Sequence, residues 1–504
     1  MRNINNKTSS NKKGKRELVI IAKNEYGIRS VNRNVKSIVN EDISNLTKLL
    51  REKNLEMVPL FFDNDDQAKR SLENLESNSK NNMQDLANYF FIKAEDERLD
   101  DVVKLLNDQP EVETAYIKPP AGLPISPSRV NSSEKEISPG ILSEQLSANE
   151  PHFIDRQSYL NAAPEGVDAF YAWKIFGGMG KGVRIIDLEW GWNFNHDDLK
   201  GNQGGLIDGI NYSDDDHHGT AVLGEISGDT NSFGITGIAP EANISAVSFS
   251  EGWETEFTAK KIMTAANKLG VGDIMLLEIH RPGPRANFEL RDDQKGYIGI
   301  EWWPDDLRAI QYAVSKGIIV VEPAGNGEQN LDDNIYDLNP EPPYGPFPSW
   351  WQNPFRRNPI DSGAILVGAG APPPGTHGRN HGPDRSRLDF SNFGSALDVQ
   401  GWGEEVTTTG GKPYGYDLFR GDGVNQWYTD YFSGTSSASP IVVGVIACIQ
   451  GIVRAKNKNP LSPLKIREIL RNTGSPQQGS SDMPVTQRIG NRPDLKHIIT
   501  TYLN

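Results

Sequence analysis

The sequence contains almost no cysteine: Cys448 is the only one in 504 residues, so the chain cannot form an internal disulfide. It also lacks a long hydrophobic run, since the best stretch, 441–453, is interrupted by Gly444 and Gln450. No apolar segment follows the basic residues near the N-terminus, so no signal peptide is predicted. These absences favour a cytoplasmic protein without a membrane span, and they leave a non-classical route of secretion open.

The chain also has fewer basic than acidic residues. Lysine and arginine number 52 against 67 aspartate and glutamate residues, which gives a net charge of −15 at pH 7. Nucleic acids and anionic membrane surfaces attract basic proteins, so we expect neither as a partner. Charged and apolar residues make up 24% and 36% of the chain, which is typical of a folded globular protein.

The chain divides by composition into four parts. Residues 1–16 form a polar basic tail that we expect to be disordered. Residues 17–118 carry apolar patterns in the order β-α-β-β-α-β, which predicts a ferredoxin-like α+β unit. Residues 119–164 are rich in proline and serine and are interpreted as a linker. From 165 to 504, short apolar runs alternate with helical patterns, which predicts an α/β domain with helices on both faces of a mostly parallel sheet.

Three polar residues stand beside predicted strands or helices in the α/β domain. Asp187 ends an apolar strand, His218 precedes Gly-Thr and a helical pattern, and Ser436 precedes a run of small and apolar residues. A serine hydroxyl is a weak nucleophile that needs an imidazole to take its proton. The imidazole in turn needs a carboxylate to orient it and to stabilise its charge. The chain supplies these groups in the order Asp, His, Ser.

These segments resemble the subtilisin-like serine proteases. The stretches IID, HGT and GTSSASP match the three motifs of that family in the same chain order, and the similarity extends over residues 165–475. The G-x-S-x-G pattern of an α/β-hydrolase is absent around Ser436. The resemblance implies a subtilisin-like three-layer α/β/α fold and a serine endopeptidase that forms an acyl-enzyme. It also implies a catalytic triad of Asp187, His218 and Ser436, with no organic cofactor.

The same resemblance assigns the oxyanion and substrate sites. Attack on a peptide carbonyl creates an oxyanion that needs hydrogen-bond donors already in place. Asn326, in the segment PAGNG after a predicted strand, matches the asparagine that supplies one such donor in the family. The backbone N–H of Ser436 would supply the second. The resemblance further implies four substrate-binding residues: Glu278, Ile279, His280 and Gly325.

The N-terminal unit looks like the propeptide of the same family, which acts as an intramolecular chaperone and inhibitor. We therefore expect residues 17–118 to lie against the catalytic domain and to present the segment that follows to its cleft. The protein would then be made as an autoinhibited zymogen that is cut between residues 118 and 165. The implied partners are protein or peptide substrates.

The sequence departs from the family pattern at two places. The usual Asp-Ser-Gly is Asp-Leu-Glu at 187–189, and the usual serine and glycine of the substrate-binding strand are Glu278 and His280. Glu278 either favours a basic substrate side chain, or faces solvent or pairs with Arg281. The departures leave open a pseudoprotease that binds peptides in the same cleft without cutting them. A serine hydrolase acting on esters is a third interpretation.

A metal ion is not assigned from the sequence. The acidic stretch between His196 and His217 has no H-E-x-x-H pattern and is interpreted as a solvated loop. Asp332, Asp333 and Asp337 offer carboxylates for a structural calcium ion, but their spacing matches no defined calcium loop. The prediction is therefore catalysis without a metal, with structural calcium left open.

Overall fold

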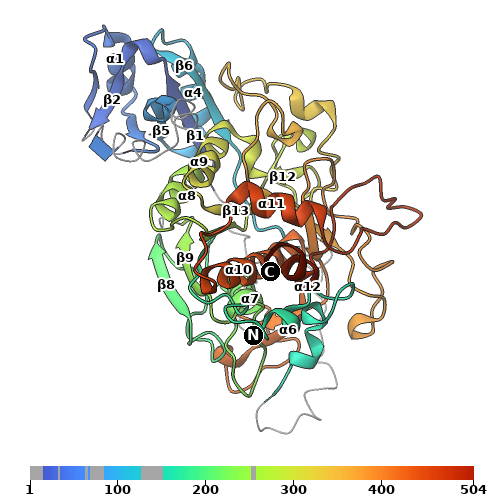
Figure 1. The fold of residues 1–504 in the computed structure, drawn as a ribbon. Coiled ribbons are helices and arrows are strands. Elements are labelled where there is room, and N and C mark those ends of the chain that lie inside the picture. The colour runs from blue at the N-terminus through green and yellow to red at the C-terminus, as the bar shows by residue number, and fades with distance from the viewer. Residues whose placement is uncertain are drawn as a thin grey trace, which may run out of the picture.

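The computed structural model shows two units that lie side by side (Figure 1). The smaller, N-terminal unit is the blue and cyan part at the upper left, and it rests on helices α8 and α9 of the larger unit. The structure describes residues 15–31, 34–62, 66–67, 84–125, 151–250 and 257–503.

The smaller unit is a four-stranded antiparallel sheet in the order β4-β5-β1-β6, with helices α1 and α4 on one face. Neighbouring side chains of a strand point to opposite faces, so Leu18 and Ile20 pack beneath these helices while Val19 and Ile21 face the larger unit. The predicted order β-α-β-β-α-β is confirmed, and the hairpin of β2 and β3 is an addition to it. The elements are β1 Glu17–Ala22, β2 Ile28–Val31, β3 Asn34–Ser37, α1 Ser44–Glu52, β4 Glu56–Pro59, β5 Tyr89–Lys93, α4 Leu99–Asn107 and β6 Val112–Lys118.

The larger unit is built on a seven-stranded parallel sheet in the order β15-β14-β13-β10-β7-β9-β8. Its strands are β7 Arg184–Glu189, β8 Gln203–Asp208, β9 Asn243–Ser248, β10 Ile274–Leu277, β13 Ile319–Pro323, β14 Ile365–Gly370 and β15 Val399–Trp402. Its helices are α6 Ala169–Ala172, α7 His217–Ser227, α8 Thr258–Ala266, α9 Pro304–Ser315, α10 Thr435–Ala455, α11 Pro463–Asn472 and α12 Leu495–Ile498. Two hairpins pair β11 His280–Pro282 with β12 Tyr297–Gly299, and β16 Val406–Thr409 with β17 Tyr428–Phe432.

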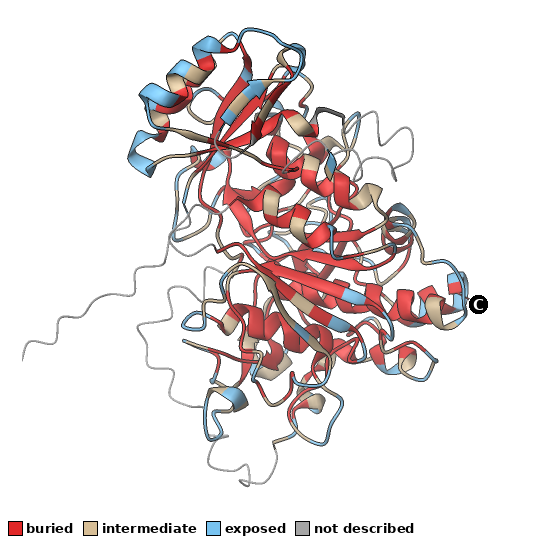
Figure 2. Ribbon diagram, turned by 90° about the vertical axis from the view of Figure 1, so that its left-hand side faces the viewer, coloured by how far each residue is buried: buried red, intermediate tan, exposed pale blue. Residues whose placement is uncertain are grey.

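Helices cover both faces of this sheet, so its central strands are buried on each side. In β7, Ile185 packs toward α7 and α10, and the next residue, Ile186, packs toward α8 and α9. Figure 2 shows buried residues concentrated in the sheet and in the helices beside it. Helix α10 is apolar and long enough to cross a membrane, but its apolar window is entirely buried within the protein. The predicted α/β/α architecture is confirmed.

The two units share one hydrophobic cluster. Val19 and Phe91 of the N-terminal sheet lie in the same cluster as Phe257 and Met263, which belong to α8 and the residue before it. The rings of Phe91 and Phe257 are stacked, with centroids 3.7 Å apart. The N-terminal unit therefore covers apolar surface of the larger unit.

A group of charges is buried at the same contact. Lys118, the last residue of β6, places its Nζ 3.0 Å from Glu17 Oε2, 2.5 Å from Asp305 Oδ2 and 2.9 Å from Asp306 Oδ1. Arg281 of β11 pairs with Glu17 as well. Removing a buried charge from its partners is costly, because the charges left behind cannot be solvated.

Replacing Lys118 with methionine is expected to lower the free energy of unfolding by about 3 kcal/mol or more, since three buried carboxylates would lose their shared cation. Thermal unfolding followed by circular dichroism measures the change. The matched control is Lys48→Met, because Lys48 is 71% exposed and its pair with Glu52 contributes at most about 0.5 kcal/mol. Equal stability of the two variants would contradict the expectation.

The linker predicted at 119–164 differs from what the structure shows. Residues 126–150 lie outside the described residues, as does most of the predicted N-terminal tail. Tyr159 and Leu160 are fully buried in the core beside α10. The larger unit therefore begins earlier than the boundary expected at residue 165, because an apolar segment within the proline-rich stretch packs against it.

Candidate active site

The carboxyl ends of β7 and β13 lie at one edge of the large sheet, beside the first turns of α7 and α10. Glu189 is the last residue of β7, and Asn326 follows β13 by three residues. His218 and Ser436 are the second residues of α7 and α10. All four side chains are buried. In parallel sheets with flanking helices, residues from separate strands converge on ligands at this edge.

The carboxylate that contacts His218 belongs to Glu189 and not to Asp187. His218 Nδ1 lies 2.8 Å from Glu189 Oε2, and the interaction is buried. Asp187 Oδ2 instead accepts a hydrogen bond of 2.7 Å from Trp192 Nε1. The expected contact between Asp187 and His218 is therefore wrong, and the role of Asp187 in catalysis stays a prediction. Strand β7 continues for two residues beyond Asp187, so Glu189 lies on the same face and nearer the edge where His218 is placed.

Glu189 and Trp192 are site residues that the sequence analysis did not single out. For Glu189 a signal was present, because two carboxylates at positions i and i+2 of a strand share a face and the later one lies nearer its carboxyl end. For Trp192 no signal was present. Its contact with Asp187 depends on how the chain turns after β7, and the sequence pattern does not reveal that.

His218 is buried and shielded from solvent. Its ring packs edge-on against Phe432 with centroids 5.3 Å apart, and burial lowers the pKa of His218 to about 3. His218 Nε2 and Ser436 Oγ are both buried, and neither forms a hydrogen bond of normal geometry within the described part of the chain. Because Glu189 occupies Nδ1, Nε2 is the nitrogen left to accept a proton.

Asn326 is fixed by the start of α10. Its Oδ1 accepts hydrogen bonds from Thr435 N at 3.0 Å and from Thr435 Oγ1 at 2.9 Å. Its Nδ2 donates to Gln294 Oε1 at 3.2 Å. The amide nitrogen of Asn326 therefore faces Gln294, and it lies close to Gly434, two residues before Ser436. The first backbone N–H groups of α10 add partial positive charge at the same place.

A short segment after the N-terminal unit lies along the edge strand β11. Gly122 and His280 exchange two backbone hydrogen bonds, N–H to carbonyl, of 3.0 and 3.1 Å, as in an antiparallel pair. Gln294 Nε2 donates to the Leu123 carbonyl at 3.3 Å. Of the predicted substrate-binding residues, His280 is thus the one that pairs with the segment around Gly122.

The same segment ends beside Asn326. A Cβ atom built on Gly434 would lie 2.0 Å from the Pro124 carbonyl oxygen and 3.1 Å from Asn326 Nδ2. Gly434 also has a φ of +100°, which residues with a side chain rarely adopt. Glycine is therefore required before Ser436, and the carbonyl of Pro124 lies next to the candidate oxyanion donors.

Glu278 points into the protein and not toward solvent or Arg281. It is fully buried, and its Oε1 accepts a hydrogen bond of 2.5 Å from Ser439 Oγ. Burial raises its pKa well above the usual range, while the hydrogen bond from Ser439 favours its ionised form. Both solvent exposure and pairing with Arg281 are therefore wrong, because Arg281 is engaged with Glu17. The preference for a basic substrate side chain stays a prediction.

The two other predicted substrate-binding residues, Ile279 and Gly325, are both buried. The side chain of Ile279 is buried in the hydrophobic cluster around α8 and α9. Gly325 has a φ of +95°, and its carbonyl accepts a hydrogen bond of 3.0 Å from Asn392 N. A Cβ atom at Gly325 would lie 2.9 Å from Asn392 Nδ2, so a side chain there would push against this contact.

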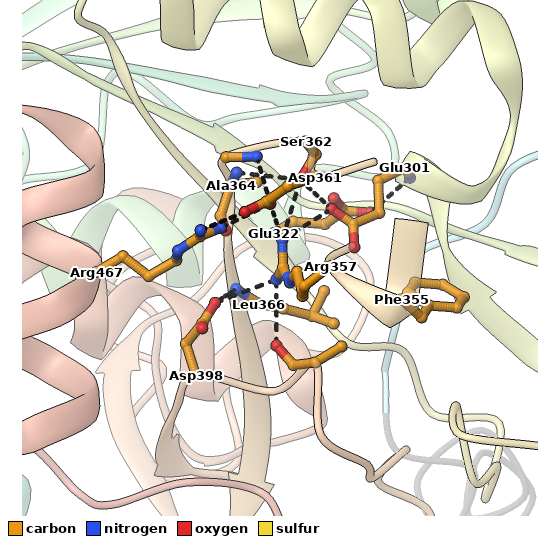
Figure 3. A network of polar contacts seen from close by, with 12 residues as sticks. Glu301, Glu322, Phe355, Arg357, Asp361, Ser362, Ala364, Leu366, Asp398 and Arg467 are labelled. Carbon is orange, nitrogen blue, oxygen red and sulfur yellow. Dashed lines mark hydrogen bonds and ion pairs between the residues drawn. The ribbon is translucent and has the colours of Figure 1, made fainter. Parts of the chain in front are cut away.

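A buried polar network supports the strand that carries Asn326 (Figure 3). Glu322 of β13 accepts a hydrogen bond of 3.1 Å from the backbone N–H of Glu301. Arg357 lies 3.7 Å from Glu301 Oε2 and 3.2 Å from Asp398 Oδ2, between the glutamates and the start of β15. Burial raises the pKa of both glutamates. The network fixes β13 against its neighbours below the loop of Asn326.

The stretch interpreted as a solvated loop is partly buried. His196 Nε2 contacts the Trp427 carbonyl at 2.8 Å, and Asp198 Oδ2 accepts a hydrogen bond of 2.7 Å from Ile235 N. Both side chains are fully buried. These residues therefore join neighbouring loops, and that part of the interpretation is wrong.

One group of side chains in the described residues could hold a metal ion: His381, Glu404 and Glu405, whose ligand atoms lie within 4.8 Å of one another. Arg379 and His381 both contact Glu405, so a cation would compete with them. The aspartates considered for calcium already contact protein donors: Asp332 contacts Ser395, Asp333 contacts Arg285, and Asp337 contacts Arg356.

Comparisons with known proteins agree on the family. The Subtilase family matches residues 180–491, which is more than half of the chain. The intracellular serine protease of Paenibacillus polymyxa is 27% identical over 325 residues, covering 61% of this chain and 79% of that protein. The major intracellular serine protease of Bacillus subtilis (strain 168) is 25% identical over 329 residues, covering 62% of this chain and 83% of that protein.

Solved structures show the same fold. The epidermin leader peptide processing serine protease from Staphylococcus aureus has a TM-score of 0.54 at 17% identity and covers 97% of this chain and 99% of its own. Fervidolysin from Fervidobacterium pennivorans, a keratinolytic enzyme related to subtilisin, has a TM-score of 0.55 at 16% identity. It covers 99% of this chain, which spans 63% of the length of fervidolysin. The chain therefore belongs to the subtilase family.

Proposed function

We propose that the protein is a serine endopeptidase whose triad is Glu189, His218 and Ser436. The observation that carries the proposal is the buried contact between Glu189 and His218 Nδ1, which leaves His218 Nε2 free beside α10. Family membership supports it, as do the names of the two bacterial serine proteases that the chain resembles.

The mechanism follows from these placements. Ser436 Oγ attacks the scissile carbonyl, and His218 Nε2 takes the serine proton. Glu189 holds the imidazole in the required tautomer and stabilises its positive charge. His218 then gives the proton to the leaving amine, and water hydrolyses the acyl-enzyme with His218 again acting as base. Asn326 Nδ2 and the Ser436 backbone N–H donate hydrogen bonds to the oxyanion.

We also propose that the segment around Gly122 is the first substrate. Its antiparallel pairing with His280 is the way in which an extended peptide adds to the exposed edge of a sheet. Its Pro124 carbonyl lies next to Asn326 and the start of α10. Ser436 would then attack Pro124 and cut the bond to Ile125. Until that cut the cleft is filled, so the chain is made in an inhibited form.

A fluorophosphonate probe tests the proposed activity, because it reacts covalently with an activated serine. With the full chain, after its own N-terminal segment has been cut, we expect one probe molecule per chain, mapped to Ser436 by peptide mass, and faster turnover of peptide than of ester substrates. An ester hydrolase would show the reverse preference. Absence of labelling would contradict the proposal and favour a pseudoprotease that only binds peptides.

Replacing Asn326 with leucine is expected to lower kcat about 100- to 1,000-fold with little change in KM, since the amide donates to the oxyanion mainly in the transition state. Steady-state hydrolysis of a chromogenic peptide measures both constants. Asn330→Ala is the control, because Asn330 lies on the same loop and its side chain bonds only Asp332 N among the described contacts. A variant that changes KM and leaves kcat intact would assign Asn326 to ground-state binding.

The first cut is expected to depend little on pH between about pH 5 and pH 8. Burial lowers the pKa of His218 to about 3, so its neutral form, which is the base, is fully populated above that value. Once the segment leaves, water enters and the pKa should return toward the usual value of about 6.5. Added peptide should then be hydrolysed more slowly below about pH 6. The rate of the first cut is measured by refolding the chain at several pH values and quenching samples over time. A rate that falls with an apparent pKa near 6.5 would contradict the expectation.

We further propose protein or peptide substrates and a cytoplasmic location. The names of two relatives, both intracellular serine proteases, support the location. The net charge of −15 supports the exclusion of nucleic acid and of anionic membrane surfaces as partners. The shared hydrophobic cluster supports the interpretation of the N-terminal unit as an inhibitor domain.

A further inference from the structure

Two carboxyl groups lie together behind His218. Asp187 and Glu189 are at positions i and i+2 of β7, so their side chains project from the same face. Both are fully or almost fully buried. Asp187 Oδ2 accepts from Trp192 Nε1 at 2.7 Å, and Glu189 Oε2 contacts His218 Nδ1 at 2.8 Å. The other oxygens, Asp187 Oδ1 and Glu189 Oε1, are buried, and neither accepts a hydrogen bond from a donor group among the described residues.

A buried pair of this kind cannot carry two negative charges, because no water screens the repulsion between them. The surrounding groups do not compensate: Glu278 lies near both members of the pair, and Asp215, just before α7, lies near Glu189. The remaining neighbours are the neutral His218 and the indole of Trp192. One proton must therefore be shared between the two carboxyls.

The contacts indicate which carboxyl holds that proton. Burial raises the pKa of both carboxyls well above the usual range. The charge of Glu189 raises the pKa of Asp187 further, whereas a hydrogen bond with Asp187 acts in the opposite direction on Glu189 and favours its ionised form. Glu189 also receives the Nδ1–H of His218, which a carboxylate accepts more strongly than a neutral acid does. These contacts favour Asp187 as the donor and Glu189 as the acceptor of a second hydrogen bond.

We propose that Asp187 is a positioning residue: as a neutral acid held by Trp192, it donates a hydrogen bond to Glu189 and fixes that carboxylate against His218. A glutamate has one more rotatable bond than an aspartate, so it loses more conformational freedom when it is held in one orientation. The second hydrogen bond supplies the constraint that the longer side chain lacks. The inference rests on the proposed role of Glu189.

Three variants distinguish the effect of a hydrogen-bond donor at position 187 from the effects of charge and of packing there. Asp187→Asn keeps a donor and the shape of the side chain, so kcat should stay within about threefold of wild type. Asp187→Leu keeps the volume and removes the donor, so kcat should fall about 10- to 100-fold with KM unchanged, as for other groups that orient a histidine partner. Trp192→Phe removes the indole donor to Asp187, so its kcat should lie between those of the two Asp187 variants.

The pH dependence of kcat/KM distinguishes the loss of a hydrogen-bond donor from a packing defect, because a packing defect would not change the apparent pKa of the profile. In Asp187→Leu the charge on Glu189 loses its donor, so the acid limb of kcat/KM should move upward by about one pH unit. In Asp187→Asn the limb should stay in place. Equal losses in the asparagine and leucine variants would mean that Asp187 acts as a charged group and would overturn the proposal. Wild-type kcat in the leucine variant would overturn it as well.

Infrared spectra test the protonation state without relying on activity. In the Ser436→Ala background, the band of a protonated carboxyl should be lost on Asp187→Asn and retained on Glu189→Gln. Loss only in the glutamine variant would place the proton on Glu189 and overturn the proposal. The proposed function fails separately: if Glu189→Gln keeps wild-type kcat, the triad assignment is wrong whatever Asp187 does.

Discussion

Replacing Ser436 with alanine is expected to lower kcat for peptide hydrolysis about a millionfold, which is the loss known for the equivalent change in subtilisin. The reason is structural: Ser436 Oγ is the hydroxyl at the start of α10, and Asn326 and Pro124 lie beside it. His218→Ala should cost about as much, because nucleophile and base act as a unit. The residual rate should reflect only binding and the oxyanion donors.

Ser433→Ala is the matched control for this loss. Ser433 is buried three residues earlier, and its Oγ has no partner among the described residues. Its hydroxyl can therefore be removed without breaking a hydrogen bond, and kcat should change less than about threefold. Progress curves with a fluorogenic peptide, at enzyme concentrations corrected by active-site titration of wild type, measure all three variants. A Ser436→Ala protein with more than about 1% of wild-type activity would contradict the account.

Replacing Glu189 with glutamine is expected to lower kcat about 10,000-fold, by analogy with loss of the triad carboxylate in serine proteases. An amide can donate to Nδ1 as well as accept from it, so His218 loses the fixed tautomer that leaves Nε2 free. The amide also gives no charge to stabilise the imidazolium. This expectation rests on the distance of 2.8 Å between His218 Nδ1 and Glu189 Oε2.

The same measurement on Asp187→Asn decides between the two carboxylates of β7. The sequence motif favours Asp187, whereas the contact with His218 favours Glu189. We expect the asparagine variant to be nearly as active as wild type. The larger loss at Asp187 would restore the assignment made from the motif and contradict the one made from the structure.

Most of the fold was predictable because its strands are buried and apolar. Strand β10 is the continuous apolar run IMLL and β13 begins with IVV, as burial of a strand on both faces requires. The strands β8 and β15 do not carry this apolar signal. The sequence of β8, QGGLID, has two glycines and half-buried side chains at the edge of the sheet, and β15 is short and contains Gly401.

The candidate site was predictable where the chain itself fixes the side chain. His218 and Ser436 follow from local motifs at helix starts, and Asn326 follows from a loop directly after a strand. Glu189 was missed because the choice between two carboxylates depends on where β7 ends. Glu278 was misplaced because its partner, Ser439, lies 161 residues away and is brought near only by the fold.

The most direct test of the account is the mass of the purified full chain after incubation, measured for wild type and for Ser436→Ala. We predict that wild type separates into two fragments that meet between Pro124 and Ile125, and that the alanine variant stays intact. This outcome would show that the chain cuts peptide bonds with Ser436 and that its own segment lies in the cleft. Cleavage at the same bond in both proteins, or an intact wild-type chain that hydrolyses no added peptide, would contradict the account.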